Sequence, residues 1–99
     1  MPNQQLTRVF HALTDPTRRA VLEQLTRGPA AVSELAQPFR MALPSFVQHL
    51  GVLEECGLVR SKKQGRVRTY TLASQPLKAA EDWLSAQRVR PRPHSRRSP

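Results

Sequence analysis

The sequence predicts a mainly α-helical domain that carries one small β-hairpin. Apolar residues recur at three- and four-residue spacing through most of the chain, as they do on the buried face of helices. Two runs rich in Val, Thr and Tyr, residues 58–63 and 67–72, meet at Gln64-Gly65, as strands joined by a tight turn do. Because the chain has 99 residues, it has room for one such domain.

The first two helices are predicted over residues 3–13 and from Pro16 to about Thr26. Asp15 is a good N-cap for the second helix, and Pro16 suits its first position because the missing N–H has no partner to lose there. The apolar residues that share one face of the first helix are Leu6, Val9, Phe10 and Leu13.

A short connection and a brief third helix are predicted next. Gly28-Pro29 ends the second helix, and the following pair, Ala30-Ala31, can form a short extended piece. Residues 32–39 then predict a brief helix that Pro38 ends early.

The fourth helix is predicted over residues 41–55. Phe46, Leu50 and Leu53 lie at helical spacing and form its buried face. Gly57 stands where a left-handed C-cap belongs.

A fifth helix is predicted from about Pro76 to Gln87. Its apolar face carries Leu77, Ala80, Trp83 and Leu84. Residues 88–99 contain mostly Pro, Arg and Ser, which cannot build a core, so we expect a disordered basic tail after a domain of residues 1–87. The tail is expected to aid solubility or to bind polyanions without specificity.

The charge of the chain favours a polyanionic partner. Sixteen Lys and Arg against seven Asp and Glu give a net charge of +9, which attracts nucleic acid or, as the lesser alternative, an anionic membrane surface. Five arginines lie in the tail, so residues 1–87 carry only +4. A local patch without an acidic residue nevertheless remains at Arg60, Lys62, Lys63, Arg66 and Arg68.

The order of the elements predicts a double-stranded DNA-binding domain. Two short helices followed at once by a hairpin with a cationic tip are typical of a winged helix-turn-helix, whose second helix enters the major groove while the hairpin reaches the backbone or minor groove. The recognition-helix candidates are Pro44, Ser45, Gln48 and His49, and the cations of the patch are the wing candidates. Gln48 offers both a donor and an acceptor to adenine, whereas the wing neutralises phosphates.

Four segments in succession resemble the ArsR/SmtB family of transcriptional regulators. They are ALTDPTRRAVLEQL (residues 12–25), VSELA (32–36), SFVQHLGVLEECGLV (45–59) and GRVRTYTL (65–72). The resemblance covers residues 5–87 and implies a winged helix with four helices, a β-hairpin and a fifth helix. It also implies dimerisation through the first and last helices, and repression by occlusion of an operator, relieved by a ligand or by another control.

The chain departs from the metal sensors of that family. Where they carry Cys-Val-Cys after a Leu, this chain has Leu35-Ala36-Gln37-Pro38, and the last helix offers Glu81 and Asp82 but no His. We therefore expect neither a metal nor another cofactor. Val47 stands where many relatives have Ser, and it could either contact a thymine methyl group or simply pack.

The two apolar helix faces predict a homodimer, because the first and fifth helices together present more apolar surface than so small a core can cover. The dimer-interface candidates are Leu6, Val9, Phe10, Leu13, Leu77, Ala80, Trp83 and Leu84. No apolar run reaches the roughly 20 residues that a membrane span needs, no secretory signal is visible in Met1–Gln5, and Cys56 is alone, so we expect a cytoplasmic protein.

Several alternatives stay open at this stage. His49 can be a half-buried structural residue or a phosphate contact, and Cys56 is favoured as a small buried residue over a redox switch. No catalytic constellation is present, so an enzyme is not expected. A winged helix that docks another protein, as an antirepressor does, is the main rival function. RNA binding is disfavoured because few aromatic residues remain to stack bases.

Overall fold

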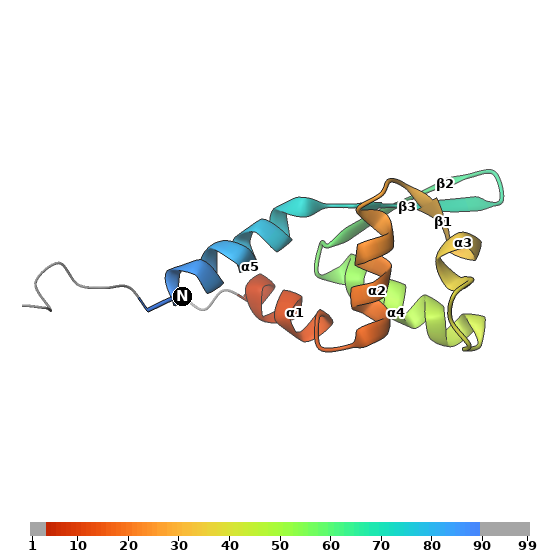
Figure 1. The fold of residues 1–99 in the computed structure, drawn as a ribbon. Helices are drawn as coiled ribbons and strands as arrows, with labels where there is room; N and C mark the ends of the chain where they lie inside the picture. Colours follow the sequence, from red (N-terminus) through yellow and green to blue (C-terminus); the bar gives the residue numbers. More distant parts are fainter. Residues whose placement is uncertain (1–3, 90–99) are drawn as a thin grey trace, which may run out of the picture.

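Five helices and a small antiparallel sheet form the part of the chain that the computed structural model describes, residues 4–89 (Figure 1). The elements are α1 (Gln4–Ala12), α2 (Pro16–Leu25), β1 (Ala30–Ala31), α3 (Val32–Ala36), α4 (Leu43–Glu55), β2 (Val59–Gln64), β3 (Val67–Leu72) and α5 (Ser74–Ala86). The predicted order of helices and hairpin is confirmed. Of the predicted tail, residues 90–99 lie outside the described part.

The sheet has the strand order β1-β3-β2. The short extended piece pairs with β3, Ala30 opposite Tyr70, and so adds a third strand to the hairpin. Gln64 pairs with Val67, which leaves Gly65 and Arg66 as the two turn residues, one position later than predicted. Gly65 has a φ of +63°, the conformation that a two-residue hairpin turn requires at its first position.

Proline chemistry sets two of the helix ends that differ from the prediction, whereas α5 begins at Ser74, two residues before the predicted start at Pro76. Pro44 has no N–H to donate to a preceding turn, so α4 begins at Leu43 rather than Met41, and its first bond runs from Phe46 N to Ala42 O at 3.1 Å. Similarly, α3 ends at Ala36, ahead of Pro38, rather than at residue 39. The α2 start is as predicted, with Asp15 as N-cap and proline in the first turn.

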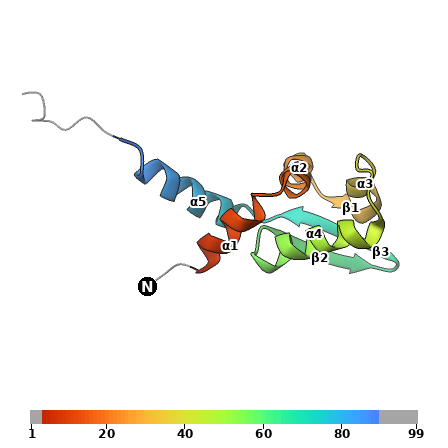
Figure 2. The same ribbon diagram turned by 90° about the horizontal axis from the view of Figure 1, so that it is seen from below.

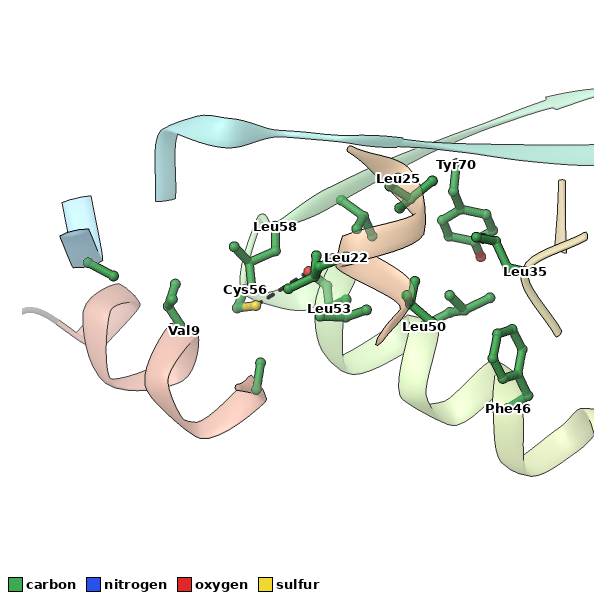
Figure 3. Packing of buried hydrophobic residues seen from close by; sticks show 14 residues of the cluster. Val9, Leu22, Leu25, Leu35, Phe46, Leu50, Leu53, Cys56, Leu58 and Tyr70 are labelled. Carbon is green, nitrogen blue, oxygen red and sulfur yellow. Dashed lines mark hydrogen bonds between the residues drawn. The ribbon is translucent and has the colours of Figure 1, made fainter. Parts of the chain in front are cut away.

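The core lies between α4, α2 and the inner face of the sheet (Figure 3). The predicted core face of α4 is confirmed, because Phe46, Leu50 and Leu53 are fully buried. Gly57, at φ +80°, ends α4. Its N–H donates a hydrogen bond to Glu54 O at 3.0 Å, and the N–H of Leu58 donates one to Leu53 O at 3.0 Å. This pair of bonds is a Schellman motif, which turns the chain directly into β2.

The two ends of the molecule are built differently (Figures 1 and 2). At one end α1 packs against α5, which runs on beyond the rest of the fold. At the other end lie α3, the beginning of α4 and the turn of the hairpin. None of the described helices is long and apolar enough to cross a membrane.

Candidate nucleic-acid interface

The solvent-facing side of α4 carries most of the predicted recognition residues. Pro44, Gln48, Gly51 and Glu55 follow the spacing i, i+4, i+7, i+11 and therefore share one face, opposite the buried one. Pro44, Gln48 and the neighbouring Ser45 are all exposed. The structure thus brings three of the four recognition candidates together on a surface free to meet a ligand.

The fourth candidate, His49, faces α2 instead. Its Nδ1 lies 3.6 Å from Asp15 Oδ2 and 3.4 Å from Nη1 of Arg18, and its side chain is only 23% exposed. Burial by itself raises the pKa of Asp15, but the backbone N–H of Arg18 and the charges of His49 and Arg18 bring that pKa below its usual value. The ring of His49 therefore joins α4 to the start of α2.

Arg18 also belongs to this region, although it is not among the site residues that the sequence predicted. Its side chain is buried, and Nε donates to Ala12 O at 2.8 Å while Nη2 donates to His11 O at 3.2 Å. These carbonyls lie at the C-terminal end of α1, where a cation is favoured. The sequence does place a cation in the first turn after Asp15-Pro16, but Arg19 is a cation in the same turn, so the pattern alone does not identify Arg18 as the buried one.

The predicted cationic patch is divided between the two faces of the hairpin. Residues directly opposite one another in an antiparallel pair share a face. Arg60 and Lys62, opposite Thr71 and Thr69, lie on the outer face. Lys63 and Arg68 lie opposite each other on the face that also carries the buried Tyr70. Arg66 lies in the turn itself, and all five cations are exposed.

A chain of hydrogen bonds ties the wing to α4. Arg68 Nη1 donates to Ser61 Oγ at 2.8 Å, and Ser61 Oγ donates to Glu54 Oε2 at 2.9 Å. Glu54 lies on the side of α4 that also carries Leu43 and Val47, at spacing i, i+4, i+11. That side of the helix therefore borders the wing.

A shallow cleft of about 280 Å³ separates the beginnings of α3 and α4 from the wing. Its lining residues are Ala31, Val32, Ser33, Leu43, Arg66, Val67 and Arg68. The lining thus combines apolar residues of helix and strand with two arginines. An exposed helix face and a cationic hairpin thus lie next to each other at one end of the molecule.

At the other end the predicted dimer surface needs a correction. Val9 and Ala80 are 1% and 3% exposed, because α1 packs against α4 and α5 within the chain, so these two residues belong to its own core. Leu6, Phe10, Leu13 and Leu77 are partly buried against that core. Trp83 and Leu84 remain 47% and 55% exposed. The rings of Trp83 and Phe10 pack edge to face, with 5.7 Å between their centroids.

No group of three or more His, Cys, Asp or Glu side chains within residues 4–89 is arranged to hold a metal ion. Cys56 is buried at the end of α4, where its Sγ donates to Leu53 O at 3.4 Å (Figure 3). Burial raises the pKa of its thiol, which disfavours the reactive thiolate.

Comparisons with known proteins agree with this geometry. A family profile for a helix-turn-helix domain matches residues 13–62. The transcriptional regulator Rv2034 of Mycobacterium tuberculosis is 45% identical over 65 residues, which are 66% of this chain and 61% of that relative. The transcriptional repressor SdpR of Bacillus subtilis is 29% identical over 79 residues, 80% of this chain and 88% of the repressor.

A solved structure is more similar still. The crystal structure of the ArsR family transcriptional regulator RHA00566 shares 56% identity, with a TM-score of 0.84 over 88% of this chain and 90% of that one. These relatives are transcriptional regulators rather than enzymes, as the sequence predicted. The chain belongs to the ArsR family of winged helix-turn-helix transcriptional regulators.

Proposed function

We propose that this chain is a repressor that binds a palindromic operator in double-stranded DNA as a homodimer. The observation that carries the proposal is the exposed face of α4, with Pro44, Ser45 and Gln48, beside a wing that holds five exposed cations. In such a domain the helix enters the major groove and the wing follows the phosphates. A bound dimer blocks access of the transcription machinery to the operator.

Gln48 carries the reading of bases in this proposal. Its amide projects from the middle of the exposed face and can donate to and accept from adenine, whereas Ser45 serves a base or a phosphate. His49 holds α4 against α2 through Asp15 and Arg18 and thereby sets the angle at which the helix projects.

The wing supplies affinity. Lys63 directly opposite Arg68 is a like-charge pair, which destabilises a hairpin in the free protein. A phosphate close to both side chains relieves this repulsion, so the pair is better suited to the DNA-bound state than to the free one. Arg66 in the turn reaches furthest from the body and meets a phosphate or the minor groove.

The second subunit covers the apolar end of the molecule. Trp83 and Leu84 lie half-exposed on α5, next to the partly buried Phe10 of α1. A two-fold axis at this end directs both recognition helices to the same side of the duplex. The half-sites then lie about one helical turn, roughly 34 Å, apart. In this proposal metal ions take no part, and the dimer acts in the cytoplasm.

Selection of bound fragments from genomic DNA by the purified protein tests this function. We expect enrichment of an inverted repeat, and an affinity for it at least about a thousandfold above that for random duplex of equal length. Equal affinity for all duplexes would overturn the proposal and favour the alternative of a winged helix that docks another protein.

A further inference from the structure

Two apolar side chains stand exposed on the side of α4 that borders the wing. Leu43 is 55% exposed and Val47 is 46% exposed, and their spacing of four residues places them next to each other along the helix. The buried face of α4, formed by Phe46, Leu50 and Leu53, lies about 70° around the helix axis, so Leu43 and Val47 border the core without entering it. Packing, which was one of the two roles that the sequence left open for Val47, therefore leaves almost half of this side chain exposed.

The large apolar residues that are exposed in the described part of the chain form two groups. One group lies on α5 and just after it: Trp83, Leu84 and Val89. The other lies at the end that carries the recognition helix and the wing: Leu43, Val47 and Val67. The proposed dimer covers the first group. It leaves the second group exposed, because that group is at the opposite end of the fold (Figures 1 and 2).

The surroundings of the second group indicate what covers it. Leu43 and Val67 line the cleft together with Arg66 and Arg68, and Val47 lies one turn along α4 from Leu43, so this apolar surface lies beside positive charge. An apolar protein segment would gain little from two exposed arginines, whereas a polyanion with an apolar group in its groove matches both features. The 5-methyl group of thymine is the apolar group that the major groove offers.

We propose that Val47, with Leu43 beside it, reads the 5-methyl group of one thymine in each operator half-site. The inference rests on the proposed function, because it requires α4 to lie in the major groove. Val47 directly precedes Gln48, so this thymine lies within one or two base-pair steps of the pair that Gln48 contacts. The polar amide and the apolar side chain then specify neighbouring positions of the half-site.

Deoxyuridine substitution tests the proposal, since deoxyuridine keeps the base pairing of thymine and lacks only the methyl group. Each thymine of the selected operator is replaced singly and symmetrically in both half-sites, and Kd is measured for each duplex. At one thymine position, the wild-type protein should bind the deoxyuridine duplex about fourfold more weakly per half-site than the thymine duplex. This is the factor expected when the burial of one methyl-sized group is lost. Val47→Ala should bind the thymine and deoxyuridine duplexes equally at that position.

Val52→Ala is the matched control. It makes the same change in the same helix, but five residues on, about 140° around the helix axis from Val47, at a partly buried position. This variant should keep the wild-type dependence on the methyl group, and circular dichroism checks that both variants fold.

Two outcomes would overturn the inference: no thymine shows a methyl dependence with the wild-type protein, or Val47→Ala retains that dependence in full. In both cases the wild-type protein still prefers its operator over random duplex, so the proposed function survives. Failure of that function is distinct, because the wild-type protein then shows no preference for any duplex.

Discussion

Arg18 Nε donates a 2.8 Å hydrogen bond to the carbonyl oxygen of Ala12, so a side chain of α2 closes the C-terminal end of α1. The same guanidinium lies 3.4 Å from His49 on α4. One buried cation therefore joins α1, at the end of the fold proposed to dimerise, to α4, the proposed recognition helix.

Arg18→Ala should destabilise the fold by about 2 to 3 kcal/mol, because it leaves two helix-end carbonyls without their charged donor. Urea unfolding at a fixed protein concentration measures this. The matched control is Arg19→Ala. The guanidinium of Arg19 donates to Leu13 O, but this bond is exposed to solvent, so its loss should change the free energy of unfolding by less than about 0.5 kcal/mol. Equal effects of the two substitutions would show that the buried bonds of Arg18 contribute no more than the exposed bond of Arg19.

Gln48→Ala and Arg66→Ala should affect binding in different ways. Loss of the Gln48 amide should cost about 1 to 3 kcal/mol on the operator and much less on random DNA, because only base edges distinguish the two. Loss of Arg66 should weaken both by similar factors and lower the salt slope by about one unit per protomer. Titrations at several salt concentrations check this. The reverse pattern would mean that α4 is not the element that reads the sequence.

Gly51→Ala should raise the stability of the fold and weaken its binding to DNA. No atom lies within 4 Å of the position that a Cβ would occupy at Gly51, so alanine should stabilise the helix by about 1 kcal/mol. The added methyl group points from the same face as Gln48, where it holds the helix away from the base pairs. We expect a higher unfolding midpoint with weaker operator binding. A gain in both quantities would show that this face does not approach DNA closely.

Leu84→Glu should convert the proposed dimer to a monomer without unfolding the chain. The side chain is 55% exposed in the single chain, so the fold tolerates a carboxylate there, whereas an apolar interface between two copies does not. Light scattering gives the mass, and circular dichroism reports the fold. Val67→Glu is the control, because Val67 is 51% exposed on the wing and lies outside the proposed interface. A Leu84→Glu protein that stays dimeric would place the interface elsewhere.

Zinc, cadmium and arsenite should not release the protein from its operator. Ala36 and Pro38 lie in the stretch that corresponds in position to the metal box of the family's sensors, and they supply no thiolate or imidazole. Fluorescence anisotropy of a labelled operator, titrated with each ion, measures release. Stoichiometric metal binding accompanied by a large loss of affinity would reveal a site formed in another way.

Local sequence signals predicted the elements of this fold well. The apolar spacing in α4, the Asp15 N-cap and the Gly57 C-cap each depend on residues within one or two turns, and all three are confirmed. The pairing of Ala30 with Tyr70 was not predicted, because the two partners lie 40 positions apart and no local residue pattern indicates that they pair.

The sequence predicted the functional site less completely than it predicted the fold. All five wing cations are exposed, but their division between two faces depends on the register that sets Lys63 opposite Arg68. The turn lies one residue later than predicted. Similarly, nothing local distinguishes buried Arg18 from exposed Arg19; only the position of the end of α1 against α2 does so.

The Schellman turn at Gly57 and the Glu54–Ser61–Arg68 hydrogen bonds have a mechanical consequence. They hold the angle between α4 and the hairpin, so in the proposed function each subunit meets DNA with its contact surface already assembled and loses little conformational entropy on binding. In the proposed dimer, neither subunit then has to change its internal shape to release DNA. A signal that releases DNA would act on the spacing between the two subunits, because a small shift at α5 would move one rigid half out of register with the helical repeat of the duplex.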